Sequence, residues 1–423
     1  MAGDSNSNEE VISTFTLRGS YGSFAGAQSA QVRQRAKLFA SAQRGNPKSL
    51  VRDTALLYVF STPLDLIPLP FGSATTLAGL VFLFVWAIAS LRGEVSVPGG
   101  GLLLSVFGAL ITWSFATASW SYAPSKSITQ SVSTLLLVLS AIAISGVLRD
   151  SIAPSAIALA LGSAVAGLAA IASGPDGTAG VEQATFLGID QNALAFHIVL
   201  GLAAALFILL RTRVPRTRSF LLLIVLVQSA SLMVVGSRTG IGSALALGLA
   251  AAVISMGSLQ RTLRALRLLT AVVLVIWWFS SRGLVPTRVL EWLENPVTTD
   301  SRGQIIEAFR NTQDEWVFKG IGTAADADYL FATTSRYKNA HSAFWKVWIE
   351  LGAVGLALWA SMLVLLAHRS WRATDKTFFG LAAIPIFLFF YTLGPLNSNM
   401  LWVVFGLAIG AGAAGAAAQR NPS

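Results

Sequence analysis

Long apolar stretches recur along the chain from Leu56 to Ala418, separated by short polar segments. A transmembrane helix needs about 20 predominantly apolar residues, so the pattern predicts about twelve spans. The predicted spans are 54–71, 74–91, 101–118, 127–148, 154–173, 191–210, 220–236, 239–257, 268–284, 342–367, 377–395 and 398–418. The first contains three prolines and Asp65, and we expect it to be broken or re-entrant. The expected fold class is therefore all-α integral membrane.

Composition supports a single membrane domain over residues 53–418. The chain is 54% hydrophobic and 12% charged, with a mean hydropathy of +0.64, whereas soluble domains carry about 25% charged residues. Residues 1–52 are polar and rich in Ser, Ala, Gly and Gln, which predicts a disordered cytoplasmic tail with a short basic helix at Gln31–Arg44. Residues 419–423 form a second, short cytoplasmic tail.

The distribution of charge predicts the orientation. With the N-terminus in the cytoplasm, the inside segments hold 20 of the 30 lysines and arginines, as the positive-inside rule requires. We therefore expect a multi-pass protein of the bacterial inner membrane with both termini in the cytoplasm. The net charge of +10 follows from this bias, and no basic face with interleaved aromatics indicates nucleic acid.

One connection, residues 283–341, is far longer than the others and is predicted to lie outside the cytoplasm. Long ordered loops are usually functional; a plain spacer is the alternative. Apolar residues at helical spacing predict a short amphipathic helix lying on the bilayer surface. These residues are Ile305, Ile306, Phe309 and Trp316.

Several patterns resemble sites but have a plainer interpretation. Gly410–Gly415 matches a dinucleotide fingerprint, but no strand precedes it, so close helix packing is favoured. Asp326 and Asp328 resemble a metal-binding acid pair, yet without a companion ligand they indicate a solvated loop. His197 and His368 are each alone and are interpreted as structural. The chain has no cysteine, and no metal site or cofactor is expected.

Three groups of residues point to chemistry on the outer face. Arg238 interrupts two spans at the outer boundary, where a charge is costly and usually has a partner or substrate; the alternative is an arginine that only ends a helix. Arg302 and Arg310 in the long loop form a cationic patch, although Arg310 could instead pair with a loop carboxylate. His341 is the one histidine in the predicted outer segments and begins a span.

Arginines and a histidine at headgroup depth suit transfer from a polyprenyl diphosphate carrier. Arginine binds phosphates through two parallel hydrogen bonds and needs no metal. Histidine titrates near neutral pH and orients or deprotonates an acceptor hydroxyl. We therefore expect loss of Arg238 or Arg302 to be at least as damaging as loss of His341.

At these residues the chain resembles the O-antigen ligase/polymerase superfamily of membrane glycosyltransferases over roughly residues 75–410. The order and spacing of several short motifs carry this resemblance. The motifs are Ala118–Ser125, Gly188–Ala195, Ser237–Gly240, Ser301–Gly303, Lys319–Gly322, and His341-Ser342 followed by Glu350-Leu351-Gly352 and Gly355. Two positions differ from the family pattern: Ser342 stands where asparagine is common, and Ile305 or Ile306 replaces an aromatic residue.

The resemblance implies a twelve-helix C-type glycosyltransferase fold and a metal-independent, inverting transfer. A glycan would pass from an undecaprenyl diphosphate carrier to the hydroxyl of a glycan, lipid or protein acceptor. It implies that His341, Arg238 and Arg302 are catalytic, and that Arg310, Asn192 and Lys319 bind substrate. Ligase and polymerase members share these residues. The rival classes are a transporter or flippase of lipid-linked glycans and a non-catalytic membrane assembly subunit, which would not depend on His341.

Overall fold

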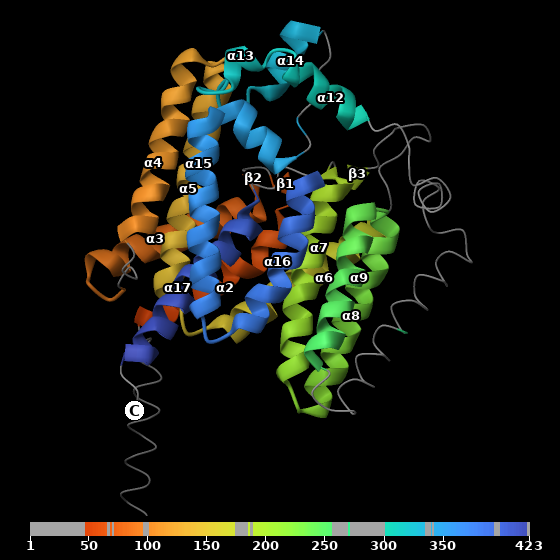
Figure 1. Ribbon diagram of the computed structural model, residues 1–423. Helices are drawn as coiled ribbons and strands as arrows, with labels where there is room; N and C mark the ends of the chain where they lie inside the picture. Colours follow the sequence, from red (N-terminus) through yellow and green to blue (C-terminus); the bar gives the residue numbers. More distant parts are fainter. Residues whose placement is uncertain are drawn as a thin grey trace, which may run out of the picture. The chain divides into compact units, whose positions relative to one another are not determined.

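The fold is known from a computed structural model (Figure 1). The residues it describes are 47–65, 68–69, 72–95, 101–173, 185–186, 189–255, 270, 301–334, 340, 342–392 and 398–420. The chain divides into two units, Met1–Leu50 and Val51–Ser423. Nearly all of the first unit, including the predicted helix Gln31–Arg44, lies outside the described residues, and the account below concerns the second.

The described part of the second unit is built of helices, with only two ladders of two-residue strands. The ladders are β1 (Pro68–Leu69) with β2 (Gly72–Ser73), and β3 (Thr185–Phe186) with β4 (Ile189–Asp190). The long helices are α3 (Ala74–Leu91), α4 (Gly101–Thr117), α5 (Pro124–Val147), α6 (Ile152–Ser173), α7 (Gln191–Arg211), α8 (Pro215–Val235), α9 (Arg238–Ser255), α15 (Ala343–Arg372), α16 (Lys376–Thr392) and α17 (Asn399–Arg420).

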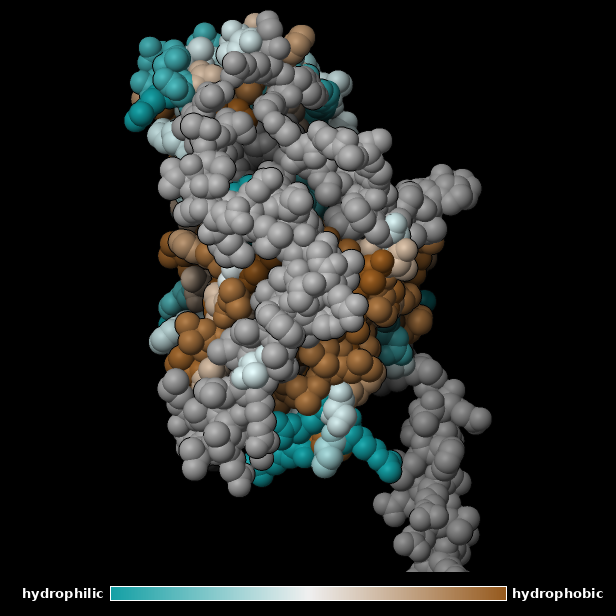
Figure 2. Space-filling model, turned by 90° about the vertical axis from the view of Figure 1, so that its right-hand side faces the viewer, coloured by the Kyte–Doolittle hydropathy of each residue, from teal (hydrophilic) through white to brown (hydrophobic). Residues whose placement is uncertain are grey.

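Eight of the described helices are long and apolar enough to cross a membrane, and the apolar segments of α9 and α16 are shorter. In Figure 2 the apolar residues gather across the middle of the visible face, with hydrophilic residues towards both ends. Large apolar side chains of the described helices are exposed, among them Phe84, Leu249 and Phe387. The chain is therefore an all-α, multi-pass membrane protein.

The first predicted span is not one helix. Helix α2 (Pro47–Ser61) gives way to the 3-10 turn η1 (Thr62–Leu64), so the predicted span 54–71 is broken as its prolines suggested. Because α2 begins at Pro47, the last residues of the predicted tail, 47–52, are helical rather than disordered. The predicted span 268–284 lies, apart from Thr270, outside the described residues.

Helix α7 lies at the centre of the bundle, against α6, α8, α9 and α16. In the most apolar 18-residue segment of α7, 89% of the residues are buried, whereas in that of α3 only 22% are buried. An apolar helix covered on all sides faces protein, while α3 offers most of its surface to lipid.

Glycines allow the closest helix contacts. Gly201 of α7 lies against Ser163 of α6, where a Cβ would overlap the serine side chain. Gly410 and Gly412 of α17 pack on the backbones of Ser145 and Arg369. The packing interpretation of Gly410–Gly415 is therefore confirmed.

Three short helices form a cap over one end of the bundle (Figure 1). They are α12 (Ser301–Arg310), α13 (Gln313–Trp316) and α14 (Asp326–Thr334). Ile305, Phe309, Trp316 and Tyr329 are buried in a separate apolar core, where Phe309 stacks on Tyr329 at 6.0 Å. The single amphipathic helix predicted for Ile305 to Trp316 is two helices, α12 and α13. The described apolar side chains of both pack inside the protein. The expectation that they face the bilayer is wrong.

The cap is joined to helix α15 at a break in that helix. Gly352, at φ 67° and ψ −170°, interrupts the helical path. The amides of Ile321 and Gly322 donate to the carbonyls of Ile349 and Glu350, both at 3.0 Å, and the amide of Ala353 donates to Val317 at 2.8 Å. Backbone groups of the cap segment Val317–Gly322 thus form hydrogen bonds with the groups of α15 that lose their helical partners at the break. We call this contact the cap joint.

Replacing Gly352 with alanine is expected to loosen the cap joint. Its φ of 67° with ψ of −170° is a conformation essentially confined to glycine, and it costs other residues about 1–3 kcal/mol. A Cβ would also overlap the carbonyl of Phe318. We expect a lower unfolding midpoint and faster proteolysis of the cap in detergent. The control is Gly380→Ala on α16, where nothing lies near the added methyl group. Equal stability of the two variants would contradict the proposed role of the joint.

Candidate functional site

Arg238 is the first residue of α9, at the point where α9 meets the beginning of α7. Helix α8 ends at Gly236 in the left-handed conformation, which turns the chain towards α9. The Ser237 hydroxyl accepts from the amide of Gly240 at 3.2 Å and donates to Asn192 Oδ1 at 2.8 Å. Asn192 lies at the start of α7, whose N-cap is Asp190.

The two helix N-termini favour an anion at this position. Each helix presents partial positive charge at its N-terminus, and Arg238 adds a full charge at the start of α9. The amides of Asn192 and Ala193 already donate to Asp190 Oδ1 at 2.7 and 3.2 Å, so a further anion would be bound mainly by Arg238. Arg238 is half-buried and already has an interaction within the protein. The structure therefore brings two sequence-predicted residues, Arg238 and Asn192, to one place.

His341 lies outside the described residues, but both of its neighbours are described. The amide of Ala340 donates to Asp326 Oδ2 at 2.8 Å, and the Ser342 hydroxyl donates to the carbonyl of Phe390 at 3.4 Å. Ala340 is therefore bonded to the cap, and Ser342 to the end of α16.

Helix α16 connects Ser342 to the start of α7. Phe389, beside Phe390, makes an edge-on contact with Phe196 of α7, with ring centres 5.2 Å apart. Phe196 lies about one helical turn after Asn192. Ala340 and Ser342 thus lie at the same end of the bundle as Asn192 and Arg238.

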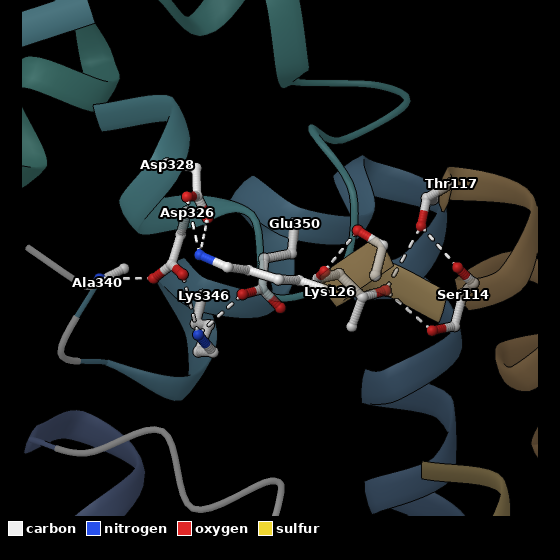
Figure 3. Close-up of polar contacts among 10 residues, drawn as sticks. Ser114, Thr117, Lys126, Asp326, Asp328, Ala340, Lys346 and Glu350 are labelled. Atoms are coloured by element: carbon white, nitrogen blue, oxygen red, sulfur yellow. Dashed lines mark hydrogen bonds and ion pairs between the residues drawn. The ribbon is translucent and has the colours of Figure 1, made fainter. Parts of the chain in front are cut away.

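A cluster of buried charges anchors the cap next to Ala340 (Figure 3). Lys346 lies 3.1 Å from Asp326 and 2.8 Å from Glu350, and both carboxylates are almost fully buried. Asp326 is 1% exposed, so its interpretation as part of a solvated loop is wrong. Sequence reasoning missed Lys346; its spacing of four residues from Glu350 on one helix was the available signal.

Asp328 has a different role from Asp326. It binds Lys126 of α5 through both carboxylate oxygens at 2.9 Å, and both side chains are partly exposed. The two aspartates are therefore held by separate lysines. Within the described residues no group of three or more potential ligands could hold a metal ion.

The remaining candidates lie on the cap. Arg302 is in α12, but its side chain is outside the described part, so proximity to Arg310 is untested. Arg310 ends the same helix and is exposed. Lys319 is exposed and lines a cavity of about 330 Å³ together with Trp120 and Tyr122. The structure does not bring Lys319 to Arg238 through any described contact.

The cap also binds the short loop before α5. Trp120 donates through Nε1 to the carbonyl of Gly320 at 3.2 Å, and the amide of Tyr122 donates to Ile321 at 3.3 Å. Buried hydroxyls continue the contact, with Ser114 lying 2.9 Å from Thr323. The motifs Ala118–Ser125, Lys319–Gly322 and Glu350–Gly352, far apart in sequence, meet at the cap joint.

A second, partly buried polar group lies among α2, α7 and α17. Asn399 donates to Asp65 at 3.0 Å and accepts from the Tyr58 hydroxyl at 3.1 Å. His197 lies 3.1 Å from the hydroxyl of Ser398 and is buried. Sequence reasoning noticed Asp65 and His197 separately but did not connect them.

The described site thus offers cationic groups and helix N-termini at the capped end, with a buried carboxylate that holds the amide of Ala340. This arrangement can bind an anionic group and position an acceptor next to it. The chain matches no protein-family model and no curated protein.

Proposed function

We propose that this chain is an O-antigen ligase/polymerase-like glycosyltransferase. It moves a glycan from a polyprenyl diphosphate carrier to an acceptor hydroxyl on the extracytoplasmic face, without a metal and with inversion. One observation carries the proposal: the Asn192–Ser237 hydrogen bond places Arg238 where the N-termini of α7 and α9 meet. A diphosphate is the kind of anion that such a position stabilises.

In the proposed reaction the acceptor oxygen attacks the anomeric carbon of the glycan. The bond from that carbon to the phosphate oxygen breaks, and polyprenyl diphosphate leaves with the bonding electrons. Arg238 and Arg302 stabilise the charge of the leaving diphosphate, which is often the larger contribution to such catalysis. His341 takes the proton of the acceptor hydroxyl or orients it.

The orientation belongs to the same proposal. Arg149, Arg211 and Arg369 lie at the end of the bundle opposite the cap, where Arg211 pairs with Asp375 and Gly410 and Gly412 pack on Arg149 and Arg369. With this end in the cytoplasm of a bacterial inner membrane, the cap faces outside. In this proposal both termini are cytoplasmic and the chain crosses the membrane twelve times.

Transport of a lipid-linked glycan is the second candidate. Two features favour it: the break of α15 at Gly352, and the polar residues Asp65, His197 and Asn399 near the starts of α7 and α17. Transporters commonly combine discontinuous helices with polar groups at membrane depth. The experiment must therefore separate transfer from movement across the bilayer.

The test is glycan transfer by the purified chain in proteoliposomes. The donor is polyprenyl diphosphate-linked glycan extracted from cells that carry this protein, and EDTA is present throughout. We expect release of polyprenyl diphosphate and a glycosylated product, whose size separates single attachment from polymerisation. Movement of intact donor to the other leaflet without its cleavage would refute the transferase and support the transporter.

A further inference from the structure

We infer that the cavity between the cap and the loop before α5 binds a neutral sugar ring of the donor glycan. This inference deepens the proposed function and rests on it for the identity of the glycan. The cavity has a volume of about 330 Å³, at the small end of ligand sites, which span about 300–1,000 Å³. It therefore suits a small group such as one part of a longer glycan.

The lining of the cavity combines aromatic and charged side chains. Trp120 and Tyr122 come from the loop before α5, while Asp314, Glu315 and Lys319 come from the cap. Aromatic side chains pack against the apolar face of a sugar ring. Carboxylates accept hydrogen bonds from its hydroxyls, and an ammonium group donates hydrogen bonds to them. A sugar ring presents both kinds of surface.

The charges of the lining disfavour a phosphate in this cavity. Two carboxylates and one ammonium group leave a net charge of −1, and like charges repel an anion. The carrier diphosphate is therefore better placed at Arg238, while the cavity takes a part of the substrate without charge. Lys319 thus remains a predicted substrate-binding residue, but for a hydroxyl rather than a phosphate.

Glu315 is held in place by two tyrosines. The hydroxyls of Tyr329 and Tyr122 donate to its Oε2 at 2.9 and 3.4 Å. Burial, assisted by the charge of Glu315, raises the pKa of Tyr329 to about 12. The same two causes raise the pKa of Tyr122. Both tyrosines therefore stay protonated near neutral pH, and the carboxylate is oriented before a ligand arrives.

The cavity is also attached to the proposed active site. Gly320 and Ile321 form part of its wall, and Ile321 donates to Ile349 in the cap joint. The following residue, Gly322, donates to Glu350, which pairs with Lys346 and through it with Asp326 beside Ala340. A sugar bound here would therefore be held at a fixed position relative to Ala340, the residue before His341 in the sequence.

The test measures binding directly and separately from transfer. The probe is the oligosaccharide released by mild acid from the carrier-linked glycan, titrated by saturation-transfer NMR against the full chain in nanodiscs. We expect saturable binding that weakens at least fivefold in Asp314→Asn and in Lys319→Met. Glu307→Gln, which removes an exposed carboxylate of α12 outside the cavity, serves as the matched control and should bind like the wild type.

The kinetic readout keeps this inference distinct from the proposed function. In the transfer assay the two cavity variants should raise the KM for the glycan donor and leave kcat nearly unchanged. Unaltered binding and KM in both variants would overturn the sugar site even where the wild type transfers glycan. If the cavity variants bind the oligosaccharide more weakly but the wild type transfers no glycan, the sugar site would be supported and the proposed transferase function would be refuted.

Discussion

Replacing Arg238 with alanine is expected to lower the kcat of glycan transfer by about 10²–10³-fold, the usual cost of removing one group that stabilises transition-state charge. Arg302→Ala should cost as much, because both guanidinium groups are proposed to bind the leaving diphosphate. His341→Ala should cost no more than this, at the lower end of the roughly 10²–10⁴-fold contribution of a general base. The measurement is single-turnover release of polyprenyl diphosphate by folded protein.

Arg238→Lys separates charge from geometry. Lysine keeps the positive charge but loses the planar fork that binds two phosphate oxygens, so we expect an activity between those of the wild type and Arg238→Ala. The matched control is Arg216→Ala, since Arg216 is exposed at the opposite end of α8 from the Ser237 turn. Its transfer rate should equal that of the wild type.

The alternatives make different forecasts for the same variants. A non-catalytic assembly subunit predicts that Arg238→Ala, Arg302→Ala and His341→Ala all behave like the wild type. If Arg238 only ends a helix and extends its charge to the membrane surface, Arg238→Ala alone should keep full activity. Either result in folded protein would remove the corresponding residue from the catalytic proposal.

The membrane helices could be predicted because their signal is local. A run of about 20 apolar residues has few stable places except a bilayer, and this held for α3 to α8, α15 and α17. The break after α2 was expected from prolines, which remove backbone donors. That α7 is surrounded by protein could not be predicted, because burial against lipid and burial against helices favour the same apolar residues.

The cap shows what a local pattern cannot supply. The spacing of Ile305 and Phe309 gives one apolar face, but any apolar surface could cover it, and α14 covers it rather than lipid. Similarly, nothing near Asp326 in sequence indicates burial, because its partner Lys346 lies twenty residues away on another helix. In the sequence, the glycines at 320, 322 and 352 could be noticed only as parts of the family motifs. The structure gives the physical reason for them, because a Cβ at any of the three would overlap a neighbouring segment.

Asp326→Ala is expected to reduce transfer more than any other change within the cap apart from a change of Arg302, which is proposed to bind the diphosphate directly. The substitution removes the acceptor for the amide of Ala340 at 2.8 Å and one of the two carboxylates around Lys346. Removing one partner of a buried pair costs about 3–5 kcal/mol, and the retained pairing of Lys346 with Glu350 places this case towards the lower value. The residue next to Ala340 is His341, so the loss should also move the proposed base.

Asp328→Ala is the matched control, because the same change two residues away removes only a partly exposed pair with Lys126. Such pairs contribute about 0–1 kcal/mol, so both the unfolding midpoint and the transfer rate should stay close to those of the wild type. A loss in Asp328→Ala equal to that in Asp326→Ala would assign the effect to general loosening of the cap.

Asp326→Asn distinguishes positioning from charge. Asparagine retains a carbonyl oxygen that can accept from Ala340, while it removes the charge facing Lys346. If Asp326 acts mainly by holding the amide of Ala340, kcat should be substantially higher in Asp326→Asn than in Asp326→Ala, with the same KM in both variants. Where the ion pair with Lys346 dominates, Asn and Ala should lose the same activity, and Lys346→Met should reproduce that loss. Equal activity of Asp326→Ala and the wild type would show that the buried cluster has no part in positioning residue 341.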